Sequence, residues 1–251
     1  AKRVQGRIER VMDWATAMKF RSGDNPARWK GNLDMIYPAP NKVKRTNNAG
    51  TEKHHSAMPY TDVPNFYSEL KNKESNSAKA LRFLILTACR SGEVLNATWD
   101  EIDFDTATWT IPASRMKAGT EHRVPLTKSM VEILQSLPEL NQYVFAGLRS
   151  DRPLSGMAML VMMRKMGYVK GGKHLAYVPH GFRSSFRDWC EEQSSFPHGV
   201  IERALAHTIP NATERAYNRG DLFDKRRLLM ESWGSYVQLV RSNVVRMEKR
   251  A

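Results

Sequence analysis

The most informative segment begins with Pro179-His180-Gly181-Phe182-Arg183, continues to Leu205-Ala206-His207 and ends with Ala216-Tyr217-Asn218-Arg219. We expect a helix over residues 180–193, in which His180 and Arg183 lie three residues apart and share a face. His207 is expected in a turn, and Tyr217 follows ten residues later. These groups suit a phosphodiester: guanidinium donors hold its oxygens, an imidazole moves protons and a hydroxyl attacks phosphorus.

The same residues carry a resemblance to a known family. His180-Gly181-Phe182-Arg183, Leu205-Ala206-His207 and Tyr217 resemble the H-x-x-R, L-G-H and Y signatures of tyrosine recombinases, the phage-integrase family. The tetrapeptide Ala216-Tyr217-Asn218-Arg219 looks most like the integrases of phages, satellite phages and genomic islands. Two positions depart from the usual pattern, since Ala206 stands where the family usually has Gly and Phe182 where Leu is commoner.

Composition and charge are compatible with this resemblance. The chain has 251 residues, of which 41% are hydrophobic and 26% charged, as in a globular protein. Its formal net charge is +13. This charge indicates either a solvated surface that happens to be basic or a surface that binds a polyanion, most simply nucleic acid. The sequence has no apolar run long enough to predict a membrane span. Cys89 and Cys190 are predicted to be reduced, buried thiols.

A second arginine lies at the end of an apolar stripe. We predict a helix over residues 77–90, with Ala78, Leu81 and Leu84 among its inward positions. Arg90 would therefore lie near the core and need a partner. That partner is either Glu93, in a structural ion pair, or a phosphate with Glu93 as support. The spacing of these two residues resembles the R-x-x-E signature of the family.

Between these motifs the sequence predicts three short strands. Ile102 and Phe104 alternate with aspartates, Trp109 and Ile111 alternate with threonines, and residues 122–126 form the third strand. Residues 115–120 form the turn before that third strand. A lysine there is ordinarily solvated, but the pattern resembles the family's hairpin, whose lysine reaches the scissile phosphate. The resemblance thus implies this role for Lys117. Arg115 and Arg123 lie nearby in the sequence as alternative candidates for it, and both are expected to bind DNA.

The N-terminal region is expected to hold a part of a second domain. Residues 4–20 read as an amphipathic helix and residues 27–30 as a short second helix. We interpret residues 1–35 as the C-terminal part of a helical core-DNA-binding domain truncated upstream. Residues 36–57 read as a basic linker that carries Lys42, Lys44 and Arg45, either disordered or lying as a strap on a nucleic-acid backbone. The resemblance favours the strap and places the catalytic domain at 58–251.

The resemblance implies a fold, a reaction and a set of partners. The fold is α+β and mainly helical, with a small three-stranded antiparallel sheet. A last helix over residues 221–241 packs on its own core or on a neighbouring protomer. The reaction is site-specific DNA cleavage and rejoining through a 3′-phosphotyrosine, without cofactor or metal. Its implied catalytic residues are Arg90, Lys117, His180, Arg183, His207 and Tyr217.

The implied partners are double-stranded attachment-site DNA, further copies of the chain in a tetramer on DNA, a DNA-bending host factor and an excisionase. The implied location of the protein is the bacterial cytoplasm, in association with the nucleoid. Two other readings remain open on sequence grounds. A type IB topoisomerase resembles the same catalytic set, although the context of Tyr217 argues against it. A DNA-binding protein without catalysis would also account for the charge.

Overall fold

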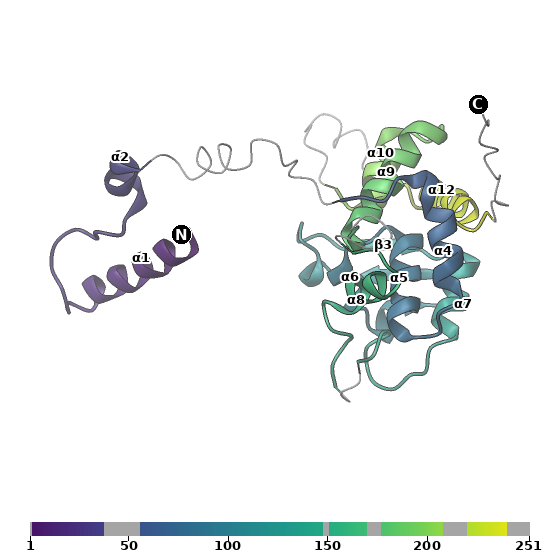
Figure 1. Cartoon of the computed structure of the whole chain (residues 1–251), viewed down its shortest axis with the longest axis horizontal. Coiled ribbons are helices and arrows are strands. Elements are labelled where there is room, and N and C mark those ends of the chain that lie inside the picture. Colours follow the sequence, from purple (N-terminus) through teal and green to yellow (C-terminus); the bar gives the residue numbers. More distant parts are fainter. Residues whose placement is uncertain (1, 38–55, 148–150, 170–176, 208–219, 240–251) are drawn as a thin grey trace, which may run out of the picture. The chain divides into compact units, whose positions relative to one another are not determined.

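The computed structural model describes residues 2–37, 56–147, 151–169, 177–207 and 220–239. The chain forms two compact units, Ala1–His54 and His55–Ala251, which are described separately. Figure 1 shows the helices and strands of both units. Within the described ranges, no helix is both long and apolar enough to cross a bilayer.

The first unit consists of α1 (Lys2–Ala17), the irregular turn η1 (Trp29–Leu33) and α2 (Asp34–Ile36). The buried Asn25 fastens the intervening loop to α1, because its amide nitrogen donates to the Glu9 carbonyl oxygen (2.8 Å) and to the Asp13 carboxylate (2.7 Å). The apolar stripe of α1 is exposed, with Val11 62% accessible. The helix predicted at residues 27–30 is not formed, since Lys30 and Gly31 have non-helical backbone angles.

The second unit is mainly helical. Its helices are α4 (Val63–Lys71), α5 (Asn76–Thr87), α6 (Ser91–Leu95), α7 (Lys128–Gln135), α8 (Ala158–Lys165), α9 (Phe182–Gln193), α10 (His198–Ala204) and α12 (Phe223–Val237). Its 3-10 turns are η2 (Tyr60–Asp62), η3 (Trp99–Glu101), η4 (Ala113–Arg115) and η5 (Pro179–Gly181). Together with the sheet described next, these elements confirm the predicted fold class.

A three-stranded antiparallel sheet of order β1-β2-β3 completes this unit. The strands are β1 (Ile102–Asp103), β2 (Thr108–Ile111) and β3 (His122–Pro125). Trp109 pairs with Ile102 on one side and with Val124 on the other, so the register places its indole in the core. The three predicted strands are therefore present, but the first is shorter than predicted, since β1 ends at Asp103 and Phe104 lies in the following turn with its side chain exposed.

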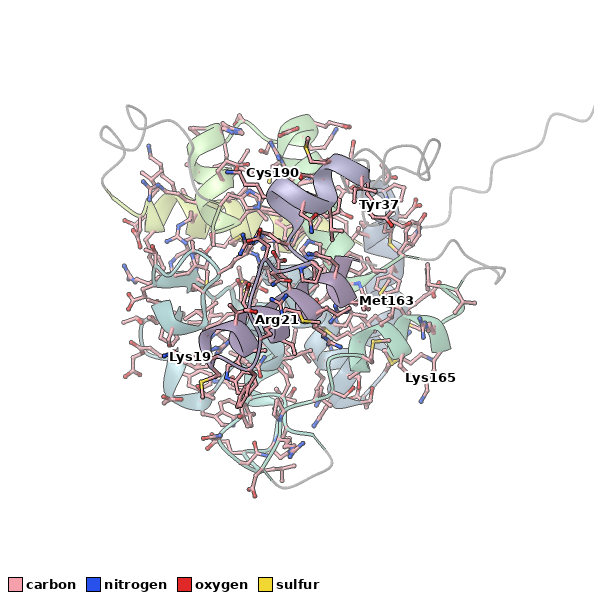
Figure 2. All side chains as sticks on the ribbon, turned by 90° about the vertical axis from the view of Figure 1, so that its left-hand side faces the viewer. Lys19, Arg21, Tyr37, Met163, Lys165 and Cys190 are labelled. Carbon is pink, nitrogen blue, oxygen red and sulfur yellow. The ribbon has the colours of Figure 1, made fainter. Side chains whose placement is uncertain are left out.

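Helix α5 is the centre of the second unit, since it packs against α4, α6, α7, α8, α9 and α12. Its start is capped by Ser75, whose hydroxyl oxygen accepts a hydrogen bond from the Ala78 N–H. Its predicted inward positions are buried, as expected from their 3.6-residue spacing. Met163 of α8 and Cys190 of α9 are also buried, whereas Lys165 is exposed; all three are labelled in Figure 2.

Several predicted helices have other boundaries in the structure: the helix expected over residues 4–20 ends at Ala17, and the one expected over residues 221–241 spans Phe223–Val237. Helix α5 ends at Thr87 and not at Arg90, because Ala88 adopts the left-handed conformation (φ 51°) and redirects the chain. The helix predicted over 180–193 begins at Phe182, because Pro179–Gly181 form a 3-10 turn. Arg90 and His180 consequently lie in turns that precede helices.

The last helix packs on its own unit. Trp233 of α12 is fully buried, and its indole N–H donates to the Ile85 carbonyl oxygen of α5 (2.8 Å). Helix α12 also contacts α4, α10 and β3. Over residues 223–237 the structure therefore supports the first of the two predicted alternatives, docking on the chain's own core.

Candidate active site

Three turns that are distant in sequence converge beside the end of α5. The first follows α5 and leads through Arg90 into α6, the second is η5 with the start of α9, and the third follows α10 at Leu205–His207. Ala88 and Ala206 both have left-handed backbone angles, with φ of 51° and 49°. These conformations expose main-chain carbonyl groups that two arginines bind.

Arg183 joins two of these turns. Its Nη1 donates to the Ala88 carbonyl oxygen (2.5 Å) and its Nη2 to the Leu205 carbonyl oxygen (2.6 Å). These oxygens belong to the C-terminal turns of α5 and α10, where helix dipoles concentrate negative partial charge. The side chain is buried, which lowers the pKa of Arg183, but a guanidinium remains charged at neutral pH.

Arg90 reaches the same turn from the N-cap position of α6. Its Nη1 lies 2.7 Å from the Glu93 carboxylate, and its Nη2 donates to the Ala206 carbonyl oxygen (3.4 Å). The Glu93 carboxylate also accepts from the Arg90 main-chain N–H (2.7 Å) and is buried. The predicted ion pair is thus present, and it orients a guanidinium that is still one quarter exposed.

His207 lies between Arg183 and a carboxylate that sequence reasoning missed. Its Nδ1 is 2.9 Å from Glu202 of α10, and its Nε2 is 3.3 Å from Nη2 of Arg183. Because a carboxylate accepts and a guanidinium donates, the neutral tautomer with hydrogen on Nδ1 satisfies both contacts. Glu202 precedes His207 by five residues, across the end of α10, and this spacing was the available signal.

His180 lies in η5, directly before α9, and its side chain is exposed, whereas that of Arg183 is buried. The two side chains therefore meet different surroundings, although the helical backbone continues from η5 into α9. The glycine between them has a clear packing role. A Cβ atom on Gly181 would lie 2.6 Å from the Ser56 carbonyl oxygen and 2.8 Å from Ala57 Cα, so residues 56–57 can approach η5 closely.

The predicted basic residues of the hairpin have different surroundings. Lys117 is exposed in the turn between η4 and β3. Arg123 lies 3.2 Å from Asp221 and stacks 4.1 Å from the centre of the Phe223 ring. Arg115 donates from Nη1 to the Glu101 carboxylate (2.6 Å) and from Nη2 to the Glu93 carbonyl oxygen (2.6 Å).

The position of Arg115 decides how available it is to a ligand. The Glu101 carboxylate is buried and the Arg115 side chain is 21% exposed, so moving Arg115 away would leave a buried carboxylate without its cation, at a cost of a few kcal/mol. That free energy opposes any movement of Arg115 towards solvent. Arg123 pairs at an exposed site, where ion pairs contribute about 0–1 kcal/mol, so its guanidinium is released easily.

Two further groups lie in the electrostatic environment of this cluster. Burial and the charge of Arg226 lower the pKa of His122 to about 4, and the charges of Arg183 and Arg90 act in the same direction. Burial raises the pKa of Cys89 to about 12, so it stays a thiol. Both cysteines are free and buried, as predicted.

Four predicted site residues lie outside the described residues. They are Tyr217 and the linker residues Lys42, Lys44 and Arg45. The structure therefore brings together Arg90, Glu93, Arg183 and His207, adds Glu202, and places His180 and Lys117 in exposed turns of the same unit.

Comparison with known proteins identifies the family. The model of the phage integrase family matches residues 57–222, and that of the phage integrase central domain matches residues 1–32. The chain is 33% identical to the prophage integrase IntZ of Escherichia coli strain K12 over 191 residues, which are 74% of this chain and 46% of IntZ. It is 27% identical to the integrase of Enterobacteria phage P4 over an alignment of 264 positions, which covers 98% of this chain and 56% of that integrase.

A solved structure agrees at the level of the fold. The lambda integrase tetramer bound to a Holliday junction superposes with a TM-score of 0.52 at 16% identity, over 84% of this chain and 57% of that one. The chain spans about half the length of the curated relatives it matches. With the family model covering the whole of the convergent cluster, this chain belongs to the phage integrase family, the tyrosine recombinases.

Proposed function

We propose that the chain is a site-specific DNA recombinase that cleaves and rejoins strands through a covalent phosphotyrosine. The observation that carries the proposal is the convergence of Arg90, Arg183 and His207 on the single turn Leu205–His207. Two guanidinium groups and an imidazole there can surround one phosphate. The net charge of +13 supports a polyanionic substrate.

Arg90 and Arg183 would stabilise the charge that develops on the phosphate. A guanidinium offers paired N–H donors that match phosphate oxygens, and such donors act most strongly where charge builds in the transition state. In the absence of DNA these donors bind main-chain carbonyl groups, which hold the guanidinium planes in place. Removing one such donor typically lowers the rate by about 10²–10³-fold.

The remaining proposed roles complete the reaction. Tyr217 Oη attacks phosphorus and its proton passes towards His180, while the bond from phosphorus to the 5′ oxygen breaks. Lys117 protonates that leaving oxygen as general acid. His207 in its imidazolium form keeps Nδ1–H on Glu202 and donates a hydrogen bond from Nε2 to the phosphate. The phosphotyrosine ester conserves the bond energy, so the attack of another strand's 5′ hydroxyl reverses the step without ATP.

The proposed partners follow from the relatives. The superposed lambda integrase structure is a tetramer bound to a Holliday junction, which supports double-stranded attachment-site DNA and a homotetramer for this chain. We also propose a DNA-bending host factor and an excisionase as partners. Because the central-domain model matches residues 1–32, we propose that residues 1–35 belong to a core-DNA-binding domain and residues 36–57 to a basic strap on DNA.

The reaction can be tested without knowledge of the attachment site. The chain is incubated at micromolar concentration with a random-sequence library of nicked duplexes, in which the short fragment that carries the freed 5′ hydroxyl diffuses away after cleavage. Adducts that resist denaturation are isolated and sequenced. The proposal predicts recovery of a defined sequence with the parent chain and none with Tyr217→Phe. Equal recovery with both chains, or no adduct with either, would refute it.

The strap is tested separately by the dependence of DNA affinity on salt. Each phosphate contact contributes about 0.9 to the slope of log K against log salt concentration. Replacing Lys42, Lys44 and Arg45 with alanine should therefore reduce the slope by roughly 3. A matched triple replacement on α8 and its flanks (Arg152, Arg164, Lys165) serves as the control and should leave the slope unchanged.

A further inference from the structure

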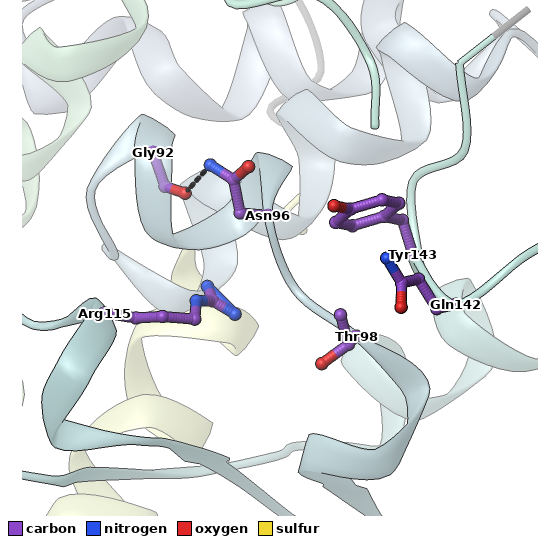
Figure 3. Close-up of a pocket in the computed structure, with 6 residues that line it drawn as sticks. All are labelled: Gly92, Asn96, Thr98, Arg115, Gln142 and Tyr143. Carbon is purple, nitrogen blue, oxygen red and sulfur yellow. Dashed lines mark hydrogen bonds between the residues drawn. The ribbon is translucent and has the colours of Figure 1, made fainter. Parts of the chain in front are cut away.

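A chain of polar contacts connects the hairpin turn that carries Lys117 to the turn that carries Arg90. It begins at Arg115, the last residue of η4 and two positions before Lys117. Figure 3 shows the Arg115 side chain extending from its turn into a hollow that Gly92, Asn96 and Tyr143 also line. The guanidinium thus crosses from the hairpin towards α6.

One end of the contact chain is firmly held. Both Glu101 carboxylate oxygens lie 2.6 Å from Arg115 Nη1, and one of them also accepts from the Trp109 indole N–H (2.9 Å). Trp109 belongs to β2 and is fully buried. The Arg115 guanidinium is therefore fixed to the sheet through a buried carboxylate.

The other end of the contact chain reaches the cluster of Arg90, Arg183 and His207, for which we propose phosphate binding. Arg115 Nη2 donates to the Glu93 carbonyl oxygen (2.6 Å), and the Glu93 side chain holds both the guanidinium and the main-chain N–H of Arg90. Arg115 and Arg90 thus both bind Glu93 of α6, Arg115 at the main-chain carbonyl oxygen and Arg90 at the side-chain carboxylate.

Chain geometry carries this constraint to Lys117. Two residues span at most about 7 Å between Cα atoms, so fixing Arg115 limits where the Lys117 backbone can lie. We propose that Arg115 is a positioning residue, which sets the Lys117 ammonium group at the distance from the Arg90-bound phosphate that protonation of the leaving oxygen requires. This inference rests on the proposed function and assigns Arg115 no contact with DNA.

A substrate with a 5′-bridging phosphorothiolate separates this role from a merely structural one. In that substrate sulfur replaces the leaving 5′ oxygen. Tyr217 Oη again bonds to phosphorus, and the phosphorus–sulfur bond breaks to release a thiolate. A thiol ionises near pH 8.5, far below an alcohol, so its departure needs no general acid. Loss of the general acid, or of its position, should therefore slow only the oxygen substrate.

The experiment measures single-turnover cleavage at saturating protein, on the duplex recovered by covalent capture, for both leaving groups. Arg115→Met should slow cleavage of the oxygen substrate by about 100-fold and leave the sulfur substrate within about threefold of the parent chain. Lys117→Ala should show the same pattern. Arg90→Ala should be slow on both substrates, and the surface variant Arg164→Met on neither.

Two further variants guard against a folding defect. Arg115→Met combined with Glu101→Gln removes both members of the buried pair, while the glutamine oxygen can still accept from Trp109. It should reproduce the Arg115→Met pattern. Arg115→Lys keeps the charge but can reach only one of the two acceptors, the Glu101 carboxylate and the Glu93 carbonyl oxygen. It should therefore cleave the oxygen substrate faster than Arg115→Met but more slowly than the parent chain.

The outcomes distinguish this inference from the proposed function. If the parent chain forms no adduct on either substrate, the proposed function fails and this inference with it. If the parent chain cleaves both but Arg115→Met and the double variant are slowed equally on oxygen and sulfur, Arg115 does not position the general acid and the inference is overturned.

Discussion

Acidification from pH 7 to pH 5 should destabilise the chain by about 2 kcal/mol through the single residue His122. The imidazole lies on β3 and is 8% exposed, and burial is the main reason that its pKa falls from 6.5 to about 4. The charges of Arg226, Arg183 and Arg90 oppose its protonation further, and Glu93 opposes them in part. The native imidazole therefore stays neutral in a pH range where the unfolded chain already binds a proton.

The direction of the effect follows from this difference in proton binding. Because the unfolded state binds more protons below pH 6.5, stability decreases as the pH falls, until the native imidazole is also protonated near pH 4. Each pKa unit corresponds to about 1.4 kcal/mol, so the shift amounts to about 3 kcal/mol in total. Roughly 2 kcal/mol of this is lost by pH 5.

Urea denaturation followed by tryptophan fluorescence measures the effect, since Trp109 and Trp233 are fully buried in the folded chain. The parent chain and His122→Gln are compared at pH 7 and pH 5. Other titrating groups contribute equally to both chains, so the difference between the two losses isolates His122. We expect the parent chain to lose about 2 kcal/mol more than the variant. Equal losses would refute the reasoning.

Three further predictions concern the candidate site. Arg183→Lys should abolish strand cleavage and lower the unfolding free energy by about 2–4 kcal/mol, because it leaves buried carbonyl acceptors unsatisfied. Adduct assays measure the cleavage and urea midpoints the stability, and a variant as stable as the parent chain would contradict this prediction. Glu202→Leu should slow cleavage about 10–100-fold at unchanged DNA affinity, because His207 loses the acceptor for its Nδ1–H; an unchanged cleavage rate would exclude this role. Ala206→Gly should raise the unfolding free energy by about 0.5–1 kcal/mol, since φ is 49°, and a lower urea midpoint would argue against a strained alanine.

The regular elements of the second unit were predictable from local patterns. Alternation of apolar residues with threonines and aspartates located the sheet, and spacing of 3.6 residues located the buried face of α5. The boundaries were less predictable, because the signals that end these helices are weak. Ala88 has the left-handed conformation that usually marks a glycine, so nothing at that position indicated that α5 stops before Arg90.

The site was predictable in its residue types but not in all of its contacts. Arg90, Arg183 and His207 were recognised by their motifs, and the structure shows what the motifs could not, namely that main-chain carbonyls hold both guanidinium groups. Whether a side chain such as Arg115 faces DNA or the protein depends on its distant contact Glu101, which no local pattern reveals. The catalytic roles themselves remain predictions.

The account depends most on Tyr217 as the nucleophile, and its covalent link to DNA can be located directly. The adduct captured on duplex DNA is digested with nuclease and trypsin, and the modified peptide is identified by mass spectrometry. Trypsin cleaves after Arg215 and Arg219, so the account predicts a nucleotide mass on the tetrapeptide Ala216–Arg219, lost on Tyr217→Phe substitution. A nucleotide on any other peptide would contradict the central claim.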